Sequence, residues 1–177
     1  AEMIKNFARG GAAICVAARS LGAELEIINL GTVYDPGPLA GVKDQPLGPG
    51  TANLVIEPAM TDHQVALALG AGRHAAERAR LEGCQLFIGG EMGIANTTST
   101  AAIAAAFLGL DPEETVGRGS GINDERMAIK RQVVRDGLAR NNPLQGDGFD
   151  ILMKVGGYDH VRLARMILGG ARRSEPT

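Results

Sequence analysis

The sequence contains no tryptophan, and aromatic residues make up only 3% of its 177 residues, so its core is expected to be aliphatic and closely packed. It also lacks an excess of charge of one sign, because 18 Lys and Arg face 20 Asp and Glu. This balance argues against nucleic acid or an anionic membrane as a partner. Neither an apolar run of about 18 residues nor a signal peptide is present, which predicts a cytoplasmic protein without a membrane span.

Cysteine is scarce, with Cys15 and Cys84 far apart and each inside an apolar run. This arrangement implies neither a disulfide framework nor a zinc site, and it predicts two buried thiols. The three histidines, His63, His74 and His160, show no metal-ligand spacing with one another or with a cysteine. We therefore expect no metal and no cofactor.

Glycine is abundant, at 25 residues, and helical patterns alternate with short apolar runs. Apolar spacing predicts one or two helices over 2–21 and a strand over 25–30. A capping box at Thr61 opens a helix that precedes a second apolar strand at 85–88. A helix between two such strands indicates a parallel β-α-β unit. We predict a single α/β domain over residues 1–177, with three αβα layers around a mostly parallel, Rossmann-like sheet that is incomplete in this chain.

Further elements follow from the same patterns. A long loop rich in proline and glycine is expected after residue 30, and small residues along the helix that starts at Thr61 predict that it packs closely on a sheet. The first residue, Ala1, already lies inside a helical pattern, so we expect a piece of a longer protein. The remaining predictions are helices over 97–108, 124–139, 149–155 and 159–168, and a loose polar tail over 172–177.

The strongest local signal for a binding site is the segment GGEMGIANTTST at 89–100, which follows a predicted strand and opens a helix. Free backbone N–H groups and the helix dipole favour an anion there, and a phosphate fits. A second glycine turn at 117–121 also precedes a helix. Lys130 lies on the apolar side of that helix, where an ammonium group needs an anionic partner or must reach solvent. Structural alternatives stay open, including a simple N-cap role for Asn96 or Thr97.

Segments along nearly the whole chain match one family in order. They are Asn6–Val16, Ile27–Gly31, Gly50–Asn53, Glu57–Thr61, Gly90–Thr98, Val116–Gly119, Lys130, Gly156–Gly157 and Gly169–Arg172. On these segments the chain resembles the nicotinate-nucleotide:dimethylbenzimidazole phosphoribosyltransferases of cobalamin nucleotide-loop assembly, as an internal fragment.

The resemblance implies a pentosyltransferase that moves the 5-phosphoribosyl group from nicotinate mononucleotide to 5,6-dimethylbenzimidazole, without a metal, in a homodimer. In the family, the glutamate that acts as base lies beyond the last residue of this chain, so no catalytic residue is expected within it. The resemblance places a methionine, here Met92, against the aromatic base. The implied substrate-binding and phosphate-binding residues are Glu91, Met92, Gly93, Asn96, Thr97, Thr98, Gly117, Gly119 and Lys130.

Two positions depart from the family pattern, because Asn29 replaces a common aspartate and Ala95 replaces a usual glycine. One alternative hypothesis is a truncated, non-catalytic module that binds a nucleotide or phosphate. Another is a nicotinamide-dependent oxidoreductase, which the glycine content alone supports. The missing G-x-G-x-x-G fingerprint argues against the oxidoreductase.

Overall fold

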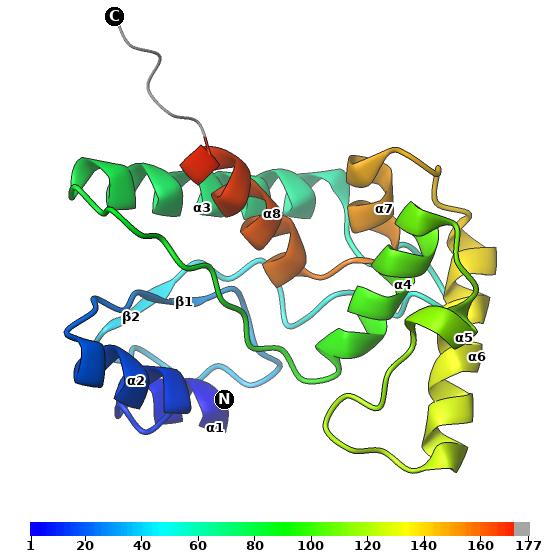
Figure 1. Ribbon diagram of the computed structural model, residues 1–177, viewed down its shortest axis with the longest axis horizontal. Helices are drawn as coiled ribbons and strands as arrows, with labels where there is room; N and C mark the ends of the chain where they lie inside the picture. The colour runs from blue at the N-terminus through cyan, green and yellow to red at the C-terminus, as the bar shows by residue number, and fades with distance from the viewer. Residues whose placement is uncertain (172–177) are drawn as a thin grey trace, which may run out of the picture. The chain divides into compact units, whose positions relative to one another are not determined.

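The computed structural model describes residues 1–171, so the tail predicted over 172–177 lies outside the described part (Figure 1). Contacts divide the chain into two compact units, Ala1–Gly50 and Thr51–Thr177. Within the described residues, no helix combines the length and the apolar character needed to cross a membrane.

The first unit contains two helices, α1 over Glu2–Ala8 and α2 over Ala13–Leu21. They are separated where Gly10 takes a left-handed conformation with φ of 73°. Gly22 ends α2 in a second left-handed conformation, which is the usual role of glycine at a helix C-terminus. The predicted helical structure over 2–21 is confirmed, and of the two possibilities left open the structure has two helices.

The same unit contains a parallel pair of strands, β1 over Ile27–Asn29 and β2 over Val42–Asp44. Ile27 lies opposite Val42, and the carboxyl ends of the strands are joined by a hydrogen bond of 2.9 Å from Asn29 Nδ2 to Asp44 Oδ1. The predicted first strand is confirmed, whereas β2 was not predicted because it lies inside the loop rich in proline and glycine. The α/β class is confirmed, as a helix-rich chain with a small parallel sheet.

The strand predicted over 85–88 is wrong. These residues form neither helix nor strand, and the side chains of Leu86 and Ile88 are 76% and 77% exposed. A strand needs a hydrogen-bonded neighbour, and the described residues of the second unit contain none. The paired strands are instead β1 and β2, and the segment that connects them contains no helix, so the predicted β-α-β unit is also wrong.

The second unit contains a long helix, α3 over Asp62–Leu81, which packs along α8 over Tyr158–Ala171 (Figure 1). The capping box predicted at Thr61 is present. The small residues of α3 face a helix rather than the predicted sheet. At Gly72 an added Cβ would lie 2.4 Å from the carbonyl oxygen of Arg162, so the absence of a side chain allows the two helices to approach closely.

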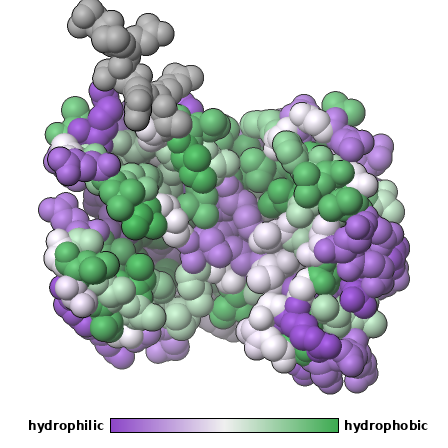
Figure 2. Space-filling model, viewed as in Figure 1, coloured by the Kyte–Doolittle hydropathy of each residue, from purple (hydrophilic) through white to green (hydrophobic). Residues whose placement is uncertain are grey.

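Four further helices surround an aliphatic core in the same unit. They are α4 over Asn96–Leu108, α5 over Pro112–Thr115, α6 over Asp124–Asn141 and α7 over Gly148–Val155. The buried residues of this core are Ala101, Ala102, Val116, Val134, Ile151 and Val155. Hydrophilic residues gather over α6, whereas hydrophobic residues gather over the carboxyl end of α4 (Figure 2).

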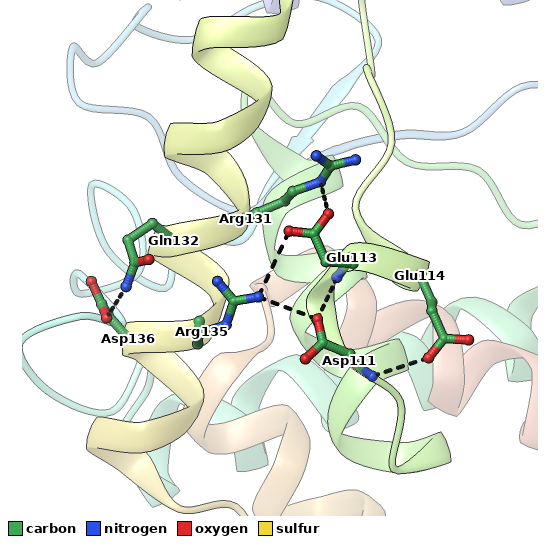
Figure 3. Close-up of polar contacts among 7 residues, drawn as sticks. All are labelled: Asp111, Glu113, Glu114, Arg131, Gln132, Arg135 and Asp136. Carbon is green, nitrogen blue, oxygen red and sulfur yellow. Dashed lines mark hydrogen bonds and ion pairs between the residues drawn. The ribbon is translucent and has the colours of Figure 1, made fainter.

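Ion pairs tie α5 to α6 (Figure 3). The Arg135 guanidinium lies 3.2 Å from the carboxylate of Asp111 and 3.8 Å from that of Glu113, and Arg131 lies 3.0 Å from Glu113. Exposed pairs of this kind add little free energy. They do, however, hold the start of α5 against α6, a few residues before Val116 and the second glycine turn.

The two cysteines differ in their surroundings. Cys15 is buried in α2, as predicted, and its thiol lies 3.6 Å from the carbonyl oxygen of Phe7. The prediction for Cys84 is wrong, because this residue is exposed in the segment that forms no strand, where its thiol donates to the carbonyl oxygen of Leu86 at 3.0 Å.

Candidate functional site

Lys130 of α6 joins the first turn of α4 to the second glycine turn. Its ammonium group donates to the Thr97 hydroxyl at 2.8 Å and to the carbonyl oxygen of Gly117 at 2.9 Å. Gly119 lies against both side chains, because an added Cβ would be 2.9 Å from Thr97 Oγ1 and 3.6 Å from Lys130 Nζ. Thr97, Gly117, Gly119 and Lys130 are thus brought together, although α4 and α6 are separated in sequence.

The charge of Lys130 is not neutralised by its neighbours. Both of its acceptors are neutral oxygens, and within the described residues no carboxylate forms an ion pair with it. Burial lowers the pKa of Lys130, since a partly buried cation without a counter-charge is disfavoured. An anion bound between the two turns would supply that counter-charge.

A second group of side chains centres on Asn96, the first residue of α4. Its amide nitrogen donates one hydrogen to Glu91 and the other to Asp159 Oδ2, the latter at 2.6 Å. Gly93 lies directly beside them, because an added Cβ would be 3.0 Å from both Asn96 Cγ and Asp159 Oδ2. The predicted residues Glu91, Gly93 and Asn96 therefore lie together, beside a carboxylate from α8 that was not predicted.

The two carboxyl groups of this cluster titrate in opposite directions. Burial and the neighbouring Asp159 raise the pKa of Glu91, although the hydrogen bond from Asn96 lowers it. Burial acts to raise the pKa of Asp159 as well, but the hydrogen bonds and charge of the adjacent His160, together with Glu91, outweigh it and lower the pKa. Asp159 is therefore the carboxylate and Glu91 the group that more readily holds a proton.

The cluster continues into two more residues that sequence reasoning missed. His160 Nε2 lies 2.9 Å from the Thr100 hydroxyl, which donates to the carbonyl oxygen of Asn96 at 3.0 Å. His160 Nδ1 lies 3.3 Å from Asp159 Oδ1. The first turn of α8 thus holds the first turn of α4. For Asp159, an available signal was its position two residues after the matched pair Gly156–Gly157.

The remaining predicted site residues take no part in these contacts. Met92 is 47% exposed, and Thr98 lies in the first turn of α4, where its backbone N–H donates to the carbonyl oxygen of Ala95 at 3.0 Å. Ala95 itself occupies the N-cap position, with φ of 67° and no side-chain capping bond. The alternative in which Asn96 or Thr97 is simply the N-cap residue is therefore wrong.

The surface beside the second turn is open. A shallow hollow of about 420 Å³ is lined by Ser120, Gly121, Ile122, Asn123 and Arg126. Among the residues that the structure describes, no group of three or more His, Cys, Asp or Glu side chains is placed to hold a metal ion.

The first turn of α4 and the second glycine turn thus meet at a lysine that pairs with no carboxylate among the described residues, an arrangement whose chemistry suits an anion such as a phosphate group. The model of the phosphoribosyltransferase family matches residues 1–177, and the chain belongs to this family. The recognition made from the sequence is thereby confirmed.

Relatives and solved structures agree with this assignment. The chain is 46% identical over 172 residues to a nicotinate-nucleotide–dimethylbenzimidazole phosphoribosyltransferase of Pseudomonas aeruginosa, and 46% identical over 177 residues to that of Azotobacter vinelandii. These matches cover 97% and 99% of this chain but 49% and 50% of the relatives. The crystal structure of CobT from Thermus thermophilus matches with a TM-score of 0.87 and 42% identity, over 96% of this chain and 50% of that one. The chain thus spans about half the length of its relatives.

Proposed function

We propose that the protein transfers the 5-phosphoribosyl group from nicotinate mononucleotide to 5,6-dimethylbenzimidazole in cobalamin biosynthesis. The products are nicotinate and α-ribazole 5′-phosphate. Residues 1–177 contribute the phosphate-binding part of the enzyme. The observation that carries this proposal is the position of Lys130, which joins the first turn of α4 to the second glycine turn and pairs with no carboxylate among the described residues. Family membership and the names of the relatives supply the substrates.

The proposed reaction is a displacement at C1′ of the ribose. The bond from C1′ to the nicotinate nitrogen breaks while a bond from C1′ to an imidazole nitrogen forms, and the imidazole loses its proton to a base. A phosphate held between the turns at 89–95 and 117–121 fixes the ribose relative to the incoming base, which lowers the entropic part of the barrier. We propose that Met92 contacts the aromatic base, and that Glu91, Gly93, Asn96, Thr97 and Thr98 complete the substrate-binding set with Gly117, Gly119 and Lys130.

The base is not assigned within this chain, because neither Glu57 nor Glu91 is required for the role by its surroundings. The family resemblance places the catalytic glutamate beyond residue 177. The alternative is therefore a module that binds the nucleotide through its phosphate and does not turn it over.

One experiment separates the two functions. The chain is mixed with nicotinate mononucleotide and 5,6-dimethylbenzimidazole, and nicotinate and α-ribazole phosphate are followed by chromatography. A parallel calorimetric titration measures binding of nicotinate mononucleotide and, as the matched control, nicotinate riboside, which lacks the phosphate. Product formation supports the transferase; binding that requires the phosphate, without product, supports the module. Absence of both would overturn both proposals.

The finer organisation of the protein follows the same resemblance. We propose that the chain belongs to a single α/β domain, that the protein acts as a homodimer, and that it acts in the cytoplasm. Sedimentation in the presence of substrates tests the dimer directly.

A further inference from the structure

The two hydrogens of a single amide group hold two carboxyl groups together. Asn96 Nδ2 donates to Glu91, five residues earlier in the turn, and to Asp159 Oδ2, in the first turn of α8. A Cβ at Gly93 would lie 3.0 Å from both Asn96 Cγ and Asp159 Oδ2, so a side chain there would crowd these two residues. The contact therefore ties the binding turn to α8 at one fixed point.

Asp159 is itself held from the other side. Its Oδ1 accepts a hydrogen bond of 2.9 Å from the backbone N–H of His160 and lies 3.3 Å from the His160 ring nitrogen Nδ1. The other ring nitrogen of His160 contacts Thr100 in α4. Asp159 thus has one oxygen fixed by its own helix and the other directed at Asn96.

We propose that Asp159 is a positioning residue for the binding turn: it fixes the Asn96 amide and, through it, the orientation of the Glu91 carboxyl group toward a bound nucleotide. This inference rests on the proposed function for the identity of the ligand. It adds a residue of α8 to a site otherwise built from the turns before α4 and α6.

The arrangement also has an electrostatic effect. Two carboxylates that meet at one amide repel each other, so the pair favours a state with one proton and one negative charge. Burial and the proximity of Asp159 raise the pKa of Glu91 accordingly. A protonated Glu91 can donate a hydrogen bond to a phosphate, whereas an ionised Glu91 would repel it.

Only a few charged groups face Glu91. From α8 these are Asp159 and His160, both of which affect its titration, and α4 presents the neutral amide of Asn96. Lys130 of α6 contacts Thr97, the residue after Asn96, rather than Glu91. Nucleotide affinity should therefore fall as the pH rises through the pKa of Glu91.

The test uses Asp159→Asn, which keeps the shape of the side chain and removes its charge. Side-chain ¹³C signals of labelled glutamate are followed against pH by NMR, and the Glu91 signal is assigned by its loss in Glu91→Gln. Binding of nicotinate mononucleotide is titrated at each pH. Asp136→Asn on α6 is the matched control. Among the described residues, the Asp136 side chain only accepts a hydrogen bond from Gln132.

In Asp159→Asn we expect the midpoint of the Glu91 titration to move to lower pH, because a group that raises its pKa is removed. The fall in nucleotide affinity should move with it, and the dissociation constant at a pH between the two midpoints should rise about tenfold, as for one lost hydrogen bond to a charged group. Asp136→Asn should change neither. Weaker binding with an unmoved Glu91 midpoint would reduce Asp159 to a structural role and overturn the inference, as would an Asp159→Asn protein identical to the wild type.

The wild type provides a second measurement if Asp159→Asn does not fold. Coupled carboxyl groups titrate in two steps that belong to the pair, so the Glu91 signal should move twice. A single step at the ordinary pKa of glutamate would overturn the inference. Because the NMR titration needs no nucleotide, its result is independent of the proposed function, which fails instead if the wild type binds no nicotinate mononucleotide.

Discussion

Lys130 has one ammonium hydrogen left for a ligand after its hydrogen bonds to Thr97 and Gly117. We predict that Lys130→Met weakens binding of nicotinate mononucleotide about 10-fold to 100-fold, because a hydrogen bond between charged groups contributes about 1.5–3 kcal/mol. Calorimetric titration at neutral pH measures this change. Lys5→Met is the matched control, since Lys5 pairs with Glu2 in the first unit. Unchanged affinity in Lys130→Met would remove this lysine from the site.

Ala95 occupies a left-handed conformation at the start of α4, with φ of 67° and ψ of 9°. A Cβ atom is strained there, by about 1–2 kcal/mol, whereas glycine is not. Glycine also has more freedom to lose on folding, so we predict that Ala95→Gly raises the free energy of unfolding by up to about 1 kcal/mol. Urea denaturation of the wild type and the variant measures this change in the free energy of unfolding. Ala128→Gly, in the middle of α6, should instead lower it by about 1 kcal/mol, and a loss in both variants would contradict the strain argument.

At the scale of elements, the contact between α3 and α8 depends on a missing side chain. We predict that Gly72→Ala lowers the free energy of unfolding by about 1–3 kcal/mol, because the new Cβ would lie 2.4 Å from the carbonyl oxygen of Arg162. Gly70→Ala on the same helix is the matched control. No atom lies within 4 Å of its Cβ position, and alanine favours a helix by about 1 kcal/mol. Thermal unfolding of both variants should show opposite shifts, and a parallel loss would argue against the clash.

Helix ends were predictable because local chemistry fixes them. The capping box at Thr61 and the left-handed Gly22 and Gly109 begin and end helices as their residue types indicate. Strands were less predictable, because pairing joins distant residues. β2 has only three residues, whereas the more apolar run at 85–88 has no partner strand in the described part of its unit.

The site shows the same contrast between features fixed by local sequence and features fixed by contacts between distant residues. The two glycine turns and Lys130 were identified from local signals, and the structure brings Thr97 and Gly117 to the lysine. Asp159 escaped prediction because it lies 63 residues from Asn96 in the sequence, and only the fold brings the first turns of α8 and α4 together. The role of each predicted site residue stays a prediction.

At the scale of the whole molecule, the chain leaves an apolar run uncovered. Leu86 and Ile88 are more than three-quarters exposed in a segment without strand pairing, which is the kind of sequence that promotes association between chains. We predict that Ile88→Lys lowers light scattering of a concentrated solution of residues 1–177 severalfold. Leu21→Lys is the control, because Leu21 is 81% exposed at the end of a helix. An equal effect of both substitutions would contradict a particular role of the run at 85–88 in association.

Cys84 lies two residues before Leu86 and is exposed, whereas Cys15 is buried. A thiol-reactive dye should therefore attach at Cys84 alone, without any engineering of the chain. The label would sit at the edge of the uncovered segment, where its fluorescence would report when another polypeptide covers Leu86 and Ile88. The chain thus carries its own attachment point for following what covers Leu86 and Ile88.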